Sequence, residues 1–148
     1  MSALGFAFCA GISLFMPPPP NPVASPGLSI DARLAVPAQT QALLKRACYD
    51  CHSNETRWPA YSRIWPGSAM IYSDVSKGRA TMNFSDWQDY SRGKKVGYLA
   101  LIQNSLHKRI MPPVKYTALH FHAKLSAKQL DAIEKWTVEE MQRLMHEK

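Results

Sequence analysis

The chain has 148 residues, the length of one domain with room for a short extension. Its formal net charge is +7, from 18 Lys and Arg against 11 Asp and Glu, and the basic residues are scattered along the chain. This scatter argues against a nucleic-acid-binding protein with a basic arm, whereas the positive excess favours an acidic protein partner or a membrane surface.

The first sixteen residues, MSALGFAFCAGISLFM, are almost entirely apolar and carry no charge. Residues 3–16 are too few for a membrane-spanning helix, which needs about 20 residues, but they have the length of a signal-peptide core. Because the basic start of a signal peptide is missing, residues 1–16 are interpreted as either a signal segment or an uncleaved membrane tether. Either alternative predicts an exported protein, held at a membrane if the segment is a tether.

The next stretch, PPPPNPVASPG, cannot form a helix or a central strand, because proline lacks a backbone donor. It predicts a stiff linker over residues 17–29, so the folded domain is expected over residues 30–148. Nothing in that domain alternates between polar and apolar residues with a period of two. The sequence therefore predicts an all-α fold.

The last expected helix has the clearest pattern. Ser126 and Gln129 form a capping box, and apolar residues recur at helical spacing between Leu130 and Leu144. By contrast, residues 53–83 carry two prolines and two glycines among aromatic residues, which predicts an irregular wrapping segment. The other expected helices are residues 37–48, a short helix from a capping box at Ser85 to a stop at Gly93, and residues 96–107.

The motif CYDCH, residues 48–52, ends the first expected helix and has three interpretations. A structural zinc site needs four ligands, but the third cysteine, Cys9, lies in the apolar leader. A thioredoxin-like dithiol needs a surrounding βαβ pattern, which is absent from the sequence. Covalent haem uses every residue, because two thiols add to two porphyrin vinyl groups and the next histidine ligates the iron. The motif therefore predicts one haem c, bound through Cys48 and Cys51 with His52 as an axial ligand.

The second axial ligand decides the chemistry of such a haem. Met111 is favoured, because Pro112 and Pro113 fix an extended loop from which a thioether can reach the iron. A methionine ligand stabilises ferrous iron and suits electron transfer, whereas an open or displaceable position would suit a peroxidase or a gas or redox sensor. A second histidine, His107 or His120, is the alternative ligand. The remaining candidates are Met70, Met82 and His122.

Two known patterns resemble this chain. The class I cytochromes c have three elements that ACYDCH, MPP and LSAKQLDAIEKW match in order. The small haem-binding domain family of exported bacterial proteins has successive motifs that resemble CHSNETRWPAY, SDVSKGR, MNFSDW, MPPVKYTALH and AKLSAKQLDAIEKW, over residues 34–136.

These resemblances imply a cytochrome c-like fold, in which the N- and C-terminal helices and irregular wrapping loops surround a covalently attached haem. They imply thioether attachment at Cys48 and Cys51, proximal ligation by His52 and distal ligation by Met111. The resemblance supports the cofactor more than the role. With His52 and Met111 as the two axial ligands, we expect a haem-binding electron carrier of the bacterial periplasm rather than an enzyme, and a peroxidase or a gas or redox sensor is the open alternative. Its expected partner is a redox protein with an acidic docking surface.

Overall fold

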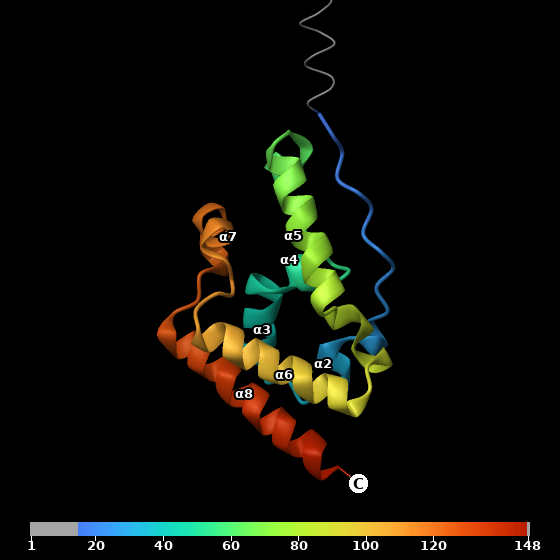
Figure 1. Ribbon diagram of the computed structural model, residues 1–148, viewed down its shortest axis with the longest axis vertical. Helices are drawn as coiled ribbons and strands as arrows, with labels where there is room; N and C mark the ends of the chain where they lie inside the picture. The colour runs from blue at the N-terminus through green and yellow to red at the C-terminus, as the bar shows by residue number, and fades with distance from the viewer. Residues whose placement is uncertain (1–14, 148) are drawn as a thin grey trace, which may run out of the picture.

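The computed structural model describes residues 15–147, and these residues form helices without a β-sheet, which confirms the all-α prediction (Figure 1). The segment predicted as signal or tether, residues 1–16, lies outside the described residues except for its last two. Among the residues described, no helix has the length and apolar character needed to cross a membrane.

The helices are α2 (Ile30–Arg33), α3 (Ala38–Ala47), α4 (Tyr49–His52), α5 (Gly67–Thr81), α6 (Arg92–His107), α7 (Val114–Leu119) and α8 (Ala127–His146), with 3-10 helices η1 (Pro26–Leu28), η2 (Ala60–Arg63), η3 (Phe84–Asp89) and η4 (Phe121–Ala123).

The last helix, α8, begins as the sequence predicts. The Ser126 hydroxyl accepts a hydrogen bond from the Gln129 backbone N–H, and the Gln129 side chain accepts one from the Ser126 N–H. The apolar stripe of α8 packs along α6 and against α3 (Figure 1). Trp136 is buried in this contact, and its indole N–H donates to the backbone carbonyl of Ala35 at 3.2 Å. The two ends of the domain are therefore joined through α8.

Replacing Ser126 by alanine is expected to lower the free energy of unfolding by about 1 kcal/mol, because the first turn of α8 loses its cap. Urea unfolding monitored by circular dichroism measures this change. Ser76→Ala is the matched control, since Ser76 is exposed inside α5 and should leave the free energy within about 0.5 kcal/mol of wild type. Equal loss in the two variants would contradict a special role for the cap.

The irregular segment predicted for residues 53–83 is the main error, because α5 occupies most of its second half. Pro66 precedes the first turn of α5, where a fixed φ is compatible with a helix start. The buried residues of α5 are Ser68, Ile71 and Val75, a narrow stripe for a helix of 15 residues. Tertiary packing against α4 and η2, rather than helix propensity, therefore stabilises α5.

The other expected boundaries need smaller corrections. The helix expected over residues 37–48 is present as α3, but the capping box expected at Ser85 is wrong. Asn83 caps η3 instead, because its side-chain oxygen accepts the Ser85 N–H at 3.0 Å. Gly93 does not stop a helix but lies in the first turn of α6. Ser91 supplies the N-cap of α6, so this helix begins at Arg92 and not at residue 96.

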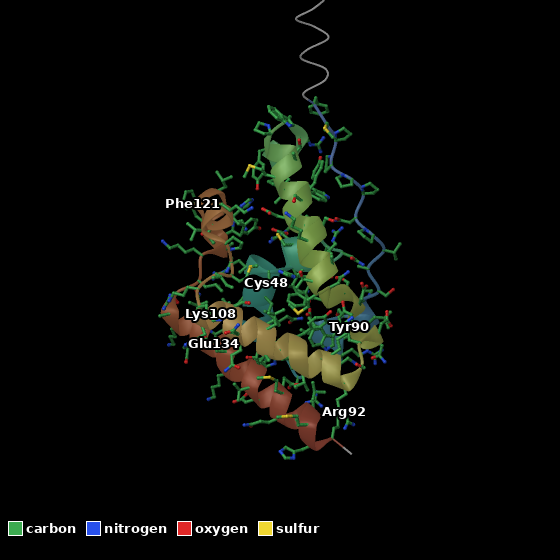
Figure 2. All side chains as sticks on the ribbon, viewed as in Figure 1. Cys48, Tyr90, Arg92, Lys108, Phe121 and Glu134 are labelled. Atoms are coloured by element: carbon green, nitrogen blue, oxygen red, sulfur yellow. The ribbon has the colours of Figure 1, made fainter. Side chains whose placement is uncertain are left out.

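Buried apolar side chains form two clusters. The larger joins α2, α3, η3, α6 and α8, with Trp87, Leu99 and Ile133 fully buried. The smaller joins α3, α5, α7 and η4 and includes Val75. Cys48 packs against both clusters and lies near the middle of the molecule (Figure 2). The two clusters therefore meet at the predicted haem motif.

Candidate functional site

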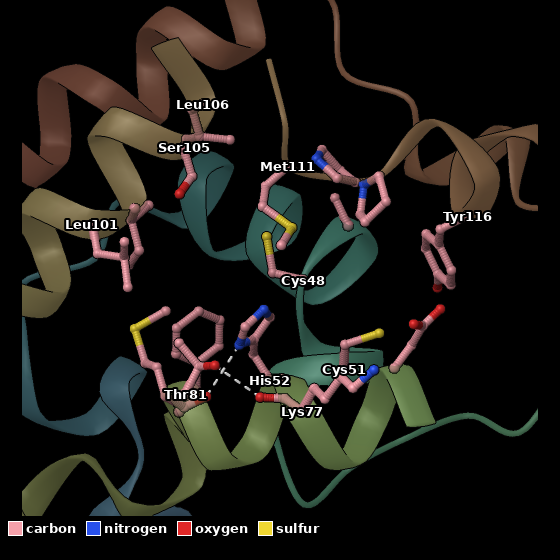
Figure 3. Close-up of a pocket in the computed structure, with 18 residues that line it drawn as sticks. Cys48, Cys51, His52, Lys77, Thr81, Leu101, Ser105, Leu106, Met111 and Tyr116 are labelled. Carbon is pink, nitrogen blue, oxygen red and sulfur yellow. Dashed lines mark hydrogen bonds between the residues drawn. The ribbon is translucent and has the colours of Figure 1, made fainter. Parts of the chain in front are cut away.

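A cavity of about 320 Å³ lies where the two clusters meet, and its walls come from α3 to α7 (Figure 3). Its volume is in the range of small-molecule and cofactor sites. Because side chains of both clusters face it, an apolar group bound there would join the clusters into one core. The apolar lining includes Ala47, Met82, Phe84, Ile102, Leu106 and Pro113.

The CYDCH motif supplies three reactive side chains to this cavity. α3 ends at Ala47, and Cys48 links it to α4. The Cys51 and His52 N–H groups of this new turn donate to the Cys48 carbonyl at 3.1 and 2.9 Å. Both cysteines are free thiols, and they line the cavity together with His52 (Figure 3). One short turn therefore presents two thiols and an imidazole to the same space.

The imidazole of His52 is oriented by a hydrogen bond behind it. Nδ1 lies 3.1 Å from the backbone carbonyl oxygen of Met82, and a carbonyl oxygen can only accept, so Nδ1 carries the proton. Burial lowers the pKa of His52 below its ordinary value, which keeps the imidazole neutral at neutral pH. Nε2 therefore retains its lone pair, as a metal-ligating histidine requires.

The two thiols are held in their protonated form. Burial raises the pKa of Cys48 to about 12 and that of Cys51 to about 11. A reactive dithiol works through a lowered thiol pKa, so this direction does not favour the thioredoxin-like interpretation. The zinc interpretation lacks ligands within residues 15–147, where no group of three or more His, Cys, Asp or Glu side chains could hold a metal ion.

Met111 lines the same cavity from the loop between α6 and α7 (Figure 3). The backbone N–H of Met111 donates to the Ser105 carbonyl at 3.4 Å, which ties the loop to the end of α6. Met82 also lines the cavity, but its carbonyl holds Nδ1 of His52 and so places its backbone behind the imidazole. Met111, by contrast, reaches the cavity from an element separate from the one whose carbonyl holds His52.

The alternative histidine ligands lie elsewhere. The His107 side chain is 80 % exposed, and its Nδ1 faces a Glu134 carboxylate oxygen at 3.8 Å. His120 is buried against Tyr116, stacked on the tyrosine ring at 4.1 Å, and its Nδ1–H donates to the Tyr116 carbonyl at 3.0 Å. Neither histidine lines the cavity, and the same holds for the remaining candidates, Met70 and His122.

Asp50 is a site residue that the sequence analysis did not identify. It lies between the two cysteines, is buried, and accepts hydrogen bonds from the Tyr116 hydroxyl at 2.7 Å and the Arg57 N–H at 3.0 Å. Its carboxylate thereby ties α7, which follows the Met111 loop, to the turn that carries the thiols. No sequence signal marks this role, because the two positions between paired cysteines accept many residue types.

Gly78 is a second unidentified residue, and it sets the distance between α5 and α4. A Cβ atom built on Gly78 would lie 2.4 Å from the Cys51 carbonyl oxygen, so only glycine allows this approach. A glycine inside a helix is a recognised signal of close packing. Because residues 53–83 were expected to be irregular, Gly78 could not be identified as a glycine inside a helix.

The cavity fits haem in its chemistry: it is apolar, it has two thiols on one turn, and it has a neutral imidazole with a free Nε2. The chain was also compared with known proteins. The family model described as "Haem-binding domain" matches residues 7–139. Comparisons with curated proteins and with solved structures found no match. Since the family match covers most of the chain and agrees with the site, this protein belongs to the haem-binding domain family and binds haem.

Proposed function

We propose that the protein is a single-haem c-type cytochrome that carries one electron at a time between redox partners. The observation that supports this proposal is the shared cavity, which brings two thiols, the His52 imidazole and the Met111 thioether together between two apolar clusters. The bound haem iron supplies the one-electron chemistry by cycling between its ferrous and ferric states.

Each residue has a separate role in this proposal. Cys48 and Cys51 each add a thiol across one vinyl group, so a carbon–sulfur bond forms and the thiol proton goes to the other vinyl carbon. His52, held at Nδ1 by the Met82 carbonyl, would supply Nε2 to the iron. Met111 would supply its thioether, which would favour the ferrous state and raise the potential. The buried part of the apolar wall, which includes Met82, Phe84 and Leu106, would keep water from that side of the haem.

We propose an electron carrier rather than an enzyme, acting in the bacterial periplasm and tethered to the inner membrane through its apolar leader. Lys77 lines the cavity and is exposed, whereas Lys115 is held by an ion pair with Asp74 at 2.8 Å. A free lysine beside the site favours an acidic docking surface on the redox partner, and the reaction rate should then fall as ionic strength rises.

Covalent attachment is tested by extraction with acidified acetone, which removes haem that is not covalently bound. Wild type, Cys48→Ser and Cys51→Ser are expected to keep haem on the polypeptide, because one thioether bond suffices. The double variant Cys48→Ser/Cys51→Ser is expected to release essentially all of it. Cys9→Ser is the matched control and should behave as wild type. Release of haem from the wild-type protein would overturn the c-type assignment.

A further inference from the structure

Five apolar residues gather at the end of the domain that carries the start of α5. The exposed fractions are 56 % for Phe15, 46 % for Met16, 57 % for Ile64, 57 % for Trp65 and 50 % for Met70. We call these five residues the apical patch. They come from two segments far apart in the sequence, which a β-bridge between Phe15 and Ile64 joins. The haem cavity does not include any of them.

The surroundings of the apical patch are almost free of charge. Residues 1–30 contain no Asp, Glu, Lys, Arg or His, and residues 58–73 contain one charged side chain, the exposed Arg63. A chain with 29 charged Lys, Arg, Asp and Glu residues therefore presents here an apolar surface with Arg63 at its edge and the Asp74–Lys115 ion pair, at 2.8 Å, one helical turn beyond Met70. An acidic protein partner would gain little from such a surface.

The segment that leads to the apical patch is fixed to the domain. The backbone N–H of Met16 donates to the Arg63 carbonyl at 2.8 Å. Farther along, the Asn21 side chain donates to the Thr56 carbonyl at 2.8 Å and accepts from Arg79 at 2.9 Å. This segment runs beside α5 in Figure 1. The proline-rich stretch is therefore held against the domain and is not a free spacer.

We propose that the apical patch lies in the headgroup region of a phospholipid membrane and holds the haem domain in one orientation there. The described residues begin at this patch with Phe15, which follows the uncharged, apolar residues 1–14 in the sequence; resting on the proposed membrane tether, this position would place the patch at the bilayer surface. Tryptophan favours membrane–water interfaces, and Arg63 supplies a cation for lipid phosphate groups.

This placement fixes the height of the haem cavity above the lipid. α5 carries the patch residue Met70 and the cavity residues Asp74, Gly78 and Thr81, which follow it by about 6, 12 and 16 Å of helix. The part of the cavity lined by Thr81 is thus held farther from the lipid than the part lined by Asp74. A free tether would instead let the domain rotate.

The first test uses the full-length haem protein in vesicles of phosphatidylcholine and phosphatidylglycerol, with and without brominated acyl chains. Bromine quenches tryptophan fluorescence at short range, and the other three tryptophans are half-buried or buried in the domain: Trp58, Trp87 and Trp136. We expect quenching of at least a quarter of the wild-type emission and none in Trp65→Phe. Equal quenching in the two proteins would overturn the proposal.

The second test compares the oxidation of two exposed methionines by hydroxyl radicals, read by mass spectrometry. In wild type on vesicles, Met70 should oxidise at least threefold more slowly than Met145, which is 59 % exposed at the end of α8. In Ile64→Ser/Trp65→Ser this protection should be lost, with unchanged circular dichroism because both residues are exposed. Equal rates in wild type would exclude lipid as the occupant and leave a protein partner. Since neither readout involves the iron, failure here is separate from failure of the proposed cytochrome function.

Discussion

Replacing Met111 by alanine is expected to remove the weak far-red absorption band that marks methionine ligation of ferric haem. It should also lower the reduction potential by on the order of 0.1 V, a fraction of the range of about 0.8 V that axial ligands control. In the proposed site the thioether would stabilise ferrous iron, and its loss would leave a position for water or carbon monoxide. Absorption spectra of both oxidation states and a potentiometric titration measure these changes.

Three further variants distinguish the candidate ligands. Met70→Ala is the matched control, because Met70 lies outside the cavity and should leave spectrum and potential unchanged. Loss of the band in Met82→Ala alone would transfer the ligand role to Met82. A spectral change in His120→Ala, with none in Met111→Ala, would indicate a bis-histidine haem. Rapid carbon monoxide binding by wild type would instead favour a sensor or peroxidase.

The central part of the site could be predicted from sequence because it is local. Cys48, Cys51 and His52 lie within one turn, so their proximity follows from chain geometry. Met111 could be singled out because two adjacent prolines mark an extended loop. The structure places all four residues around one cavity, although haem ligation and attachment remain predictions.

The rest of the site depends on contacts between distant segments. Nδ1 of His52 is oriented by a backbone carbonyl, and any residue at position 82 would offer one. Asp50 acquires its role from Tyr116, 66 residues away. The helix α5 was missed for a related reason: it buries only Ser68, Ile71 and Val75, and it has a glycine where it meets α4. So short a buried stripe gives weak helical periodicity, and the close approach at Gly78 is visible only in the tertiary structure.

Gly78→Ala is expected to lower the free energy of unfolding by about 2 kcal/mol. The new Cβ atom would lie 2.4 Å from the Cys51 carbonyl oxygen, whereas ordinary contact begins at 3.4 Å, so α5 and α4 must separate by about 1 Å. Overpacking of this kind costs up to about 3 kcal/mol, and the gain in helix propensity returns about 1 kcal/mol. Urea unfolding of the haem-bound protein gives the value.

Gly97→Ala is the matched control, because Gly97 also lies inside a helix, α6, and a Cβ atom there meets nothing within 4 Å. That variant should be more stable than wild type by about 0.5–1 kcal/mol, from helix propensity alone. The free energy of unfolding should therefore fall in Gly78→Ala and rise in Gly97→Ala, so that the two variants differ by about 3 kcal/mol. Because Gly78 faces the turn between the two thiols, its variant should also incorporate less haem. Two variants of equal stability would show that α5 does not contact the CYDCH turn as closely as described.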